Sequence, residues 1–94
     1  SFHQYMIELT YLLFLKMAKE TGAETQIPKG YRWGDLKNRS ESEQVEFYKQ
    51  LLNHLGAEGS VIVKAIFADA KSSINKSNTL FALISGIDKL DWYN

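Results

Sequence analysis

The strongest hydrophobic pattern in the chain lies near its start, from Glu8 to Met17, and it predicts a central helix. Successive residues of a helix lie about 100° apart, so one broad face collects most of the apolar side chains. That face holds Met6, Leu9, Thr10, Leu13, Phe14, Met17 and Ala18. The opposite face holds Gln4, Glu8, Lys16 and Lys19. We therefore expect an amphipathic helix that ends at Gly22, a residue suited to the left-handed helix stop.

The pattern of this helix is imperfect, because four large side chains fall among the charges on its polar side. They are Tyr5, Tyr11, Leu12 and Leu15. Two explanations stay open. Either two layers of the protein cover the helix, or part of it remains exposed for a partner.

A second helix is predicted after Ser40, because Ser40 and Glu43 have the spacing of a capping box. Its apolar positions recur at helical spacing, and Gly56 is expected to close it. These positions are Val45, Tyr48, Leu51, Leu52 and Leu55.

Two more helices are predicted in the second half of the chain. Residues 61–70 begin with β-branched residues, which taken alone favour a strand, but the pairs Ile62/Ile66 and Val63/Phe67 have helical spacing. A last helix is expected to be capped by Ser77 or Asn78 and to end near Gly86 or Asp88. Its apolar face holds Leu80, Leu83, Ile84 and Ile87. Leu90 and Trp92 then form an apolar tail that we expect to clasp the bundle.

Residues 27–36 carry the only proline and two of the six glycines, so they predict an ordered loop. Its aromatic residues suggest anchors on the core. The same region, extended to residue 39, is also the most basic part of the sequence. Its cations are Lys29, Arg32, Lys37 and Arg39, with Asp35 among them. Such a patch can hold phosphates. Both interpretations, core anchor and phosphate contact, remain open.

Together these segments predict an all-α fold, a small bundle of four or five helices around a central apolar helix, with an ordered aromatic loop. With 94 residues, we expect residues 1–94 to form one domain. Eleven cations balance eleven anions, so whole-chain charge gives no reason to expect strong, unaided nucleic-acid binding. The absence of cysteine excludes disulfides and agrees with a cytoplasmic protein. The apolar run is shorter than the roughly 20 residues a bilayer needs, so we expect no membrane contact.

No residue pattern indicates catalysis. His3 and His54 lie on different predicted elements, and no metal-binding spacing is present. Gly30 and Gly34 flank bulky residues, which do not suit a phosphate-cradling loop. The residues alone indicate a helical accessory or binding domain with no catalytic, cofactor or metal site.

Four stretches, taken in order and spacing, resemble the N-terminal helical domain of the methylation subunit of type I restriction-modification enzymes. They are ELTYLLFLKM (8–17), IPKGYRWGDL (27–36), IFADA (66–70) and IDKLDW (87–92). The resemblance covers almost the whole chain. It implies that the parent subunit transfers a methyl group from S-adenosylmethionine to an adenine in DNA. The family's Asn-Pro-Pro-aromatic motif is absent, since Pro28 is the sole proline. We therefore expect a fragment of a longer subunit, without the catalytic domain and without a cofactor of its own.

The resemblance also implies partners: the catalytic domain of the same chain, the specificity subunit, a second methylation subunit, and DNA. Lys29, Arg32, Lys37 and Arg39 become candidates for weak contact with the DNA backbone. Tyr5, Leu12 and Leu15 become candidates for domain or subunit contact. The alternative is a pure protein-docking module that does not touch DNA.

Overall fold

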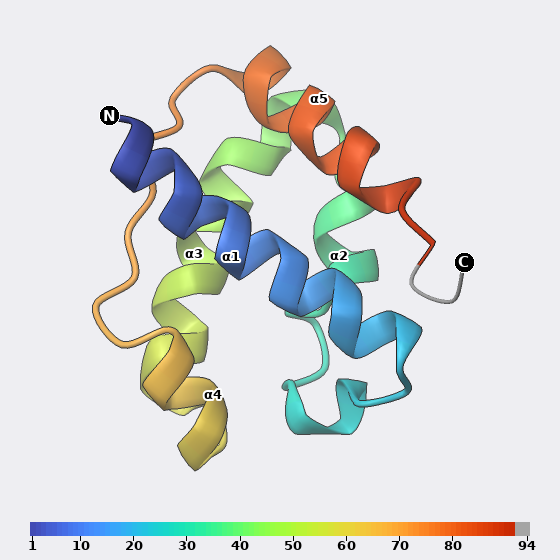
Figure 1. Ribbon diagram of the computed structural model, residues 1–94, viewed down its shortest axis with the longest axis vertical. Helices are drawn as coiled ribbons and strands as arrows, with labels where there is room; N and C mark the ends of the chain where they lie inside the picture. The colour runs from blue at the N-terminus through green and yellow to red at the C-terminus, as the bar shows by residue number, and fades with distance from the viewer. Residues whose placement is uncertain (92–94) are drawn as a thin grey trace.

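Residues 1–91 are described by a computed structural model, and they form five α-helices and one short 3-10 helix with no strand among them (Figure 1). The elements are α1 (Phe2–Glu20), η1 (Glu24–Gln26), α2 (Trp33–Lys37), α3 (Glu41–Glu58), α4 (Val61–Ile66) and α5 (Ser77–Asp88). The all-α fold class is therefore confirmed. Within residues 1–91, no helix combines the length and apolar character needed to cross a membrane.

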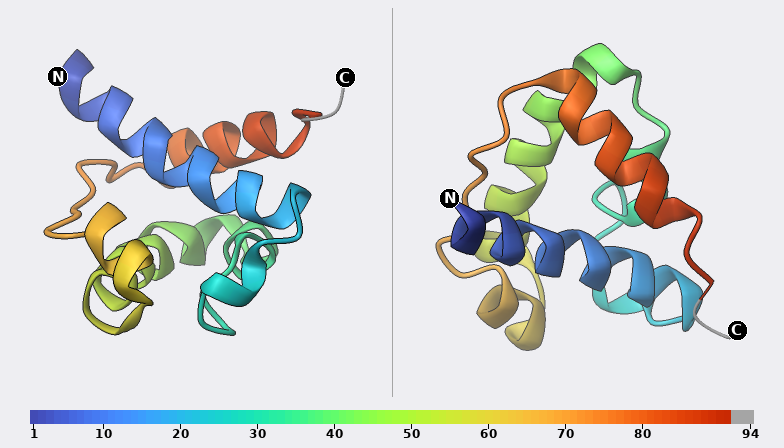
Figure 2. Two further views of the ribbon diagram at one scale, coloured as in Figure 1. Left: turned by 60° about the horizontal axis from the view of Figure 1, so that its bottom comes forward. Right: turned by 45° about the horizontal axis from the view of Figure 1, so that its top comes forward.

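The helices pack in two layers. α1 and α5 lie together on one side, and α2, α3 and α4 lie beneath them (Figure 2). α5 packs against α3 as well as α1, and α2 bridges α1, α3 and α5. α1 crosses the front of the bundle from end to end (Figure 1), while α3 packs against α2, α4 and α5.

The C-terminus of α1 ends as its sequence predicts. Gly22 has a φ of +76°, the left-handed conformation that glycine adopts without a steric penalty. The Ala23 amide donates to the Ala18 carbonyl at 2.8 Å, which satisfies one of the last carbonyls of the helix. The chain can therefore turn sharply toward η1 and α2.

The predicted orientation of α1 is wrong. Its buried residues are Glu8, Leu12, Leu15, Lys16 and Ala18, most of which lie on the face expected to be polar. Leu12 and Leu15 are both 0% exposed, whereas Met6 and Met17, expected in the core, are exposed. The charged residues of this face are buried because they have partners. Glu8 accepts hydrogen bonds from Ser72 and Ser73, and Lys16 pairs with Glu20 at 2.9 Å.

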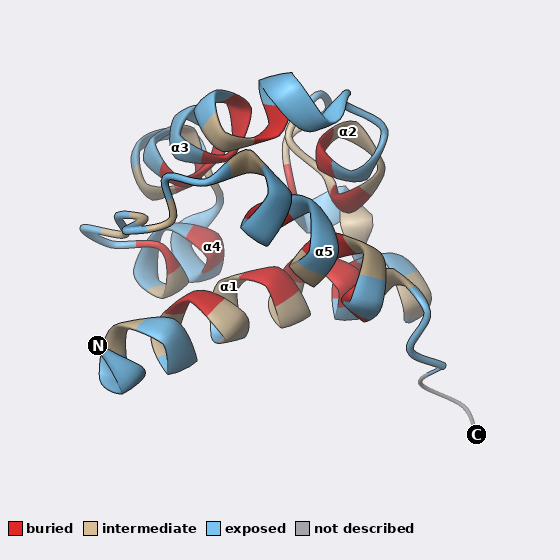
Figure 3. Cartoon of the chain, turned by 90° about the horizontal axis from the view of Figure 1, so that it is seen from above, coloured by how far each residue is buried: buried red, intermediate tan, exposed pale blue. Residues whose placement is uncertain are grey.

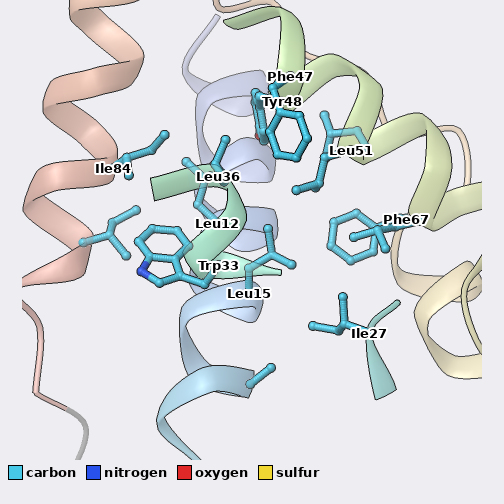
Figure 4. Packing of buried hydrophobic residues seen from close by; sticks show 14 of the residues in the cluster. Leu12, Leu15, Ile27, Trp33, Leu36, Phe47, Tyr48, Leu51, Phe67 and Ile84 are labelled. Carbon is cyan, nitrogen blue, oxygen red and sulfur yellow. The ribbon is translucent and has the colours of Figure 1, made fainter. Parts of the chain in front are cut away.

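The core forms where α1 meets α2, α3 and α5. Figure 4 shows Leu12 and Leu15 among buried side chains of the other helices. Trp33 and Leu36 of α2 are fully buried, and Ile27 almost so. The predicted core anchors are thus confirmed for Trp33 and Leu36, but the predicted loop over 27–36 is only partly right, because residues 33–36 belong to the helix α2. The full buried cluster also includes Phe47, Tyr48, Leu51, Leu52, Leu55, Val63, Phe67, Leu80, Ile84 and Ile87.

α3 begins after Ser40, as predicted, but its capping bond and its end differ from the prediction. Ser40 is the N-cap residue, but its hydroxyl donates to the Glu43 carboxylate at 2.8 Å instead of accepting a backbone hydrogen bond. The helix also continues through Gly56 to Glu58. Gly56 has a different role, since a Cβ there would lie 2.6 Å from the Phe67 carbonyl oxygen. Its missing side chain permits the close approach of the segment that follows α4.

The second half of the chain is less helical than predicted. α4 ends at Ile66, and Asp69 has a φ of 55°, so the predicted helix over 61–70 stops after six residues. α5 begins after Lys76, whose side chain makes no capping bond, so neither Ser77 nor Asn78 is the N-cap residue. Leu90 is 47% exposed and does not clasp the bundle. Trp92, the other residue of the predicted tail, lies outside the described residues.

Candidate nucleic-acid and partner-contact sites

The basic segment is a folded corner. Gly30 has a φ of +92°, and the Tyr31 amide donates to the Pro28 carbonyl at 3.2 Å, which closes a turn. The Asp35 carboxylate then accepts the Arg32 backbone N–H at 3.0 Å and starts α2. The cations of this segment therefore project from an ordered backbone, and their side chains have different contacts.

Lys37 belongs to the polar network that links three helices. Its Nζ lies 3.1 Å from Asp88 Oδ2, while Asp88 Oδ1 accepts the Trp33 indole N–H at 2.8 Å. The buried Lys16 Nζ lies 3.8 Å from the same carboxylate. The Trp33 hydrogen bond, together with Lys37 and Lys16, holds the pKa of Asp88 below its ordinary value. The Lys37 ammonium is therefore already paired with the Asp88 carboxylate in this structure.

Arg39 caps a row of stacked side chains, the Arg39 stack. Its guanidinium lies 3.9 Å from the Phe47 ring centroid. Phe47 stacks on Tyr31 at 6.1 Å, and Tyr31 stacks on His54 at 3.8 Å. The stack orients Arg39 without neutralising its charge, because none of its other members is a carboxylate.

Arg32 and Arg39 come together in a surface hollow of about 390 Å³, the cation-lined hollow. Arg32 Nε donates to the Ile27 carbonyl at 2.9 Å, so the side chain is held in place. The hollow is lined by Lys19, Glu24, Arg32, Gly34, Asp35, Asn38 and Arg39. Three cations thus face two carboxylates and an amide. Lys19 was missed by sequence reasoning, since it precedes the basic segment and reaches the hollow only through the turn at Gly22.

The other two candidate cations lie outside the hollow. Lys29 is exposed at the turn, and Lys37 points to Asp88. Of the four residues proposed for the DNA backbone, the structure therefore brings together Arg32 and Arg39 and adds Lys19 to them.

The candidates for partner contact require a correction. Tyr5 is 44% exposed, but Leu12 and Leu15 are 0% exposed and pack inside the domain. The expectation that Leu12 and Leu15 are available at the surface is wrong, because burial of Glu8 and Lys16 turns their face of α1 inward.

The ionisable groups in the core form no reactive site. Burial acts to raise the pKa of Glu8, but hydrogen bonds from Ser72, Ser73 and Gln4 outweigh it and lower the pKa below 4.5. Burial and the negative charge of Glu8 raise the pKa of Tyr48. Glu8 therefore stays ionised and Tyr48 stays protonated near neutral pH, with 1% and 0% exposure. Residues 1–91 also contain no cluster of three or more His, Cys, Asp or Glu side chains that could hold a metal ion.

A larger hollow, of about 490 Å³, lies between α3 and the segment after α4. Lys49 and Lys71 are among its lining residues, but Lys49 donates to Asn75 at 3.1 Å and Asp69 also lines the hollow. These side chains do not converge on one point as a catalytic or anion site requires.

Comparison with known proteins connects this architecture to one group. The methylase subunit of the type I restriction enzyme StySPI from Salmonella potsdam is 50% identical over 95 residues. The EcoKI methylase subunit from Escherichia coli strain K12 is 47% identical over 95 residues. Both matches cover the whole chain but 18% of the relative, so the chain spans under a fifth of the length of these relatives. No family model matches the chain.

A solved structure agrees with the sequence matches. The crystal structure of the EcoKI M protein superposes with a TM-score of 0.92 at 46% identity, over 98% of this chain and 19% of that one. The fold is thus a small all-α domain, and residues 1–91 contain no cluster of side chains that could hold a metal ion. The chain belongs to the methylase subunits of type I restriction enzymes and corresponds to their N-terminal helical domain. The family resemblance predicted from the four sequence stretches is confirmed.

Proposed function

We propose that residues 1–94 act as a non-catalytic accessory domain of a type I restriction-modification DNA methyltransferase subunit. In this role the domain holds DNA in position and contributes to assembly with the specificity subunit and a second methylation subunit. Similarity over the whole chain to methylase subunits supports this assignment. The methyl transfer from S-adenosylmethionine to adenine belongs to the catalytic domain of the same subunit, in the cytoplasm.

The domain itself does not fit S-adenosylmethionine. The sulfonium of that cofactor is positively charged, and the cation-lined hollow presents Lys19, Arg32 and Arg39. Even with Glu24 and Asp35 in the lining, the hollow keeps an excess of one positive charge, which does not favour a sulfonium. We therefore assign no cofactor-binding role to these residues.

The cation-lined hollow is the observation that carries the DNA-positioning role. Lys19, Arg32 and Arg39 converge there from α1, the loop and the end of α2, and guanidinium groups suit phosphate oxygens. Contacts of this kind position a protein on DNA without reading its bases, which agrees with sequence recognition by a separate subunit. Glu24 and Asp35 in the same hollow, and the zero net charge of the chain, keep the contact weak.

The salt dependence of DNA binding tests this role in the complete methylase subunit. The double variant Lys19→Gln, Arg39→Gln should lower the slope of log K against log salt by about two units, roughly one for each lost phosphate contact. Fluorescence anisotropy of a labelled duplex between about 50 and 200 mM salt measures the slope. Lys64→Gln is the matched control, because Lys64 is exposed on α4 and lies outside the hollow. An unchanged slope in the double variant would rule out the hollow as a DNA contact.

A pure docking role without DNA contact is the second candidate. Two observations favour it: Lys37 is paired with Asp88, and α1 exposes Phe2, Met6 and Met17 at the surface. The same titration separates the two roles, since a docking module keeps the wild-type salt slope when Lys19 and Arg39 are replaced.

A further inference from the structure

The outward side of α1 carries a row of apolar residues, the outer face of α1. The row consists of Phe2, Met6, Leu9, Leu13 and Met17, at intervals of three or four residues. Phe2 is 79%, Met6 46% and Met17 40% exposed, while Leu9 and Leu13 are partly buried. Figure 3 shows the buried positions of α1 directed into the bundle and the outer side of its turns uncovered.

The outer face of α1 carries no charged residue from Phe2 to Met17. Its polar members are His3, at the exposed first turn, and Thr10, whose hydroxyl donates to the Met6 carbonyl at 3.0 Å and so is satisfied within the helix. The fifteen steps from Phe2 to Met17 span roughly 22 Å along the axis at about 1.5 Å per residue. Single exposed apolar residues are ordinary on protein surfaces, but a continuous uncharged row of this length indicates a contact surface.

DNA does not fit this surface, because phosphates require cations and the outer face of α1 has none. An uncharged, apolar face instead suits a permanent protein interface, from which charged residues are depleted. The length of the relatives indicates the partner. This chain covers 18% of their length, so more than four-fifths of such a subunit lies outside this domain and can provide the facing surface. A permanent contact within one chain also needs no separate encounter, which an apolar surface without steering charges would slow.

We propose that the outer face of α1 packs against an apolar surface of the same methylase subunit, outside residues 1–94. The proposal rests on the proposed function, in that it takes the chain as an accessory domain of a longer subunit. It assigns the two sides of α1 to two interfaces, with Leu12 and Leu15 in the core of the domain and Met6 and Met17 in the contact with the rest of the subunit.

Cysteine labelling tests the proposal, because residues 1–94 contain no cysteine and an introduced thiol is therefore the only one in this domain. Met6→Cys and Met17→Cys place a thiol on the outer face of α1, and Gln50→Cys places one at an exposed position of α3. Each variant of the complete methylase subunit, without other subunits, is treated with N-ethylmaleimide, and the modified peptide is quantified by mass spectrometry. The Met6→Cys and Met17→Cys variants should react about tenfold or more slowly than the Gln50→Cys control, because reaction requires local opening.

Three outcomes would overturn the proposal. Equal labelling at the three positions in the complete subunit would show that the outer face of α1 is uncovered. Protection that begins only when the specificity subunit is added would assign the face to that subunit. Protection that increases with the concentration of the methylase subunit would assign it to a second copy.

A second variant guards against indirect effects of the cysteines. Adding Met6→Lys to the Met17→Cys variant should raise the rate of labelling, because a buried, unpaired ammonium loosens an apolar contact. The control, Met6→Lys with Gln50→Cys, should label at the original rate. The DNA titration tests a different claim. An unchanged salt slope together with a protected Met6→Cys thiol would reject the DNA-positioning role but would still support this interface.

Discussion

At the scale of one residue, Glu8 shows how a charged side chain with enough hydrogen-bond donors can lie on the buried face of a helix. Its carboxylate accepts the Ser73 backbone N–H at 3.0 Å and the Ser73 hydroxyl at 2.9 Å, and it also binds the Ser72 hydroxyl. The segment between α4 and α5 is thereby attached to α1. A buried carboxylate is tolerated only when its oxygens are satisfied, and here several donors satisfy them.

Replacing Glu8 with glutamine should destabilise the domain. The amide keeps the shape of the side chain but loses the charge-assisted hydrogen bonds and brings an NH₂ group toward the donors of Ser72 and Ser73. Hydrogen bonds to a charged group contribute about 1.5–3 kcal/mol, so a loss of this order in the free energy of unfolding is expected. Urea denaturation followed by circular dichroism measures it.

Glu46→Gln is the control for this change. Glu46 is exposed on α3, so its replacement should alter the free energy of unfolding by less than about 0.5 kcal/mol. A Glu8→Gln variant as stable as the Glu46→Gln variant would contradict the role given to Glu8.

At the scale of elements, two helical glycines should respond to alanine in opposite directions. A Cβ on Gly56 of α3 would lie 2.6 Å from the Phe67 carbonyl oxygen, so Gly56→Ala should cost about 1–3 kcal/mol by forcing the backbone apart. A Cβ on Gly86 of α5 meets nothing within 4 Å. Gly86→Ala should therefore stabilise the domain by about 0.5–1 kcal/mol, the difference in helix propensity.

Thermal unfolding of the two variants measures this contrast, and each variant serves as the control for the other. Stabilisation by Gly56→Ala would show that α3 and the segment after α4 do not approach each other as described.

The helices α1, α3, α4 and α5 could be predicted from the sequence, because apolar residues recur at helical spacing and Gly22 marks the end of α1. The short helix α2 was not predicted, because Pro28, Gly30 and Gly34 indicated a loop over residues 27–36. The orientation of α1 could not. Both sides of this helix are apolar, so periodicity does not decide between Met6 and Leu12 as core residues. The decision comes from Ser72, Ser73 and Asp88, which lie far along the chain and satisfy the charges of Glu8 and Lys16.

The candidate site was predicted in part for the same reason. Arg32 and Arg39 are close in sequence and share the hollow, as a local basic patch suggests. Lys19 joins them and Lys37 turns away because of contacts made by α1 and α5. Whether a given lysine lines the hollow depends on tertiary packing, and the spacing of charges along the chain does not determine it.

At the scale of the whole molecule, Glu8 and Asp88 make stability dependent on pH. The folded state lowers the pKa of both carboxyl groups below their ordinary values of 4.5 and 3.8. Unfolding raises these pKa values again, so the unfolded chain binds more protons in this range. The stabilisation is complete above about pH 4.5 and should be lost as the pH falls through the lowered pKa values.

Acid titration at fixed urea, followed by circular dichroism, measures this loss. The Glu8→Gln variant and an Asp88→Asn variant should each show a smaller decrease in stability between neutral and acid pH than the unchanged chain. If stability decreased as much in both variants as in the unchanged chain, the acid sensitivity would belong to other carboxylates.

The two apolar sides of α1 have a consequence for genetics. A mutation at Leu12 removes core packing, so its phenotype should be low abundance of the subunit, because unfolded protein is degraded. A mutation at Met6 or Met17 leaves the core of residues 1–94 intact, so the subunit should accumulate normally and yet lose the contact between this domain and the rest of the subunit. A mutational scan of residues 2–20 should therefore separate into two classes of allele that alternate along one helix, and a measurement of protein abundance would distinguish them.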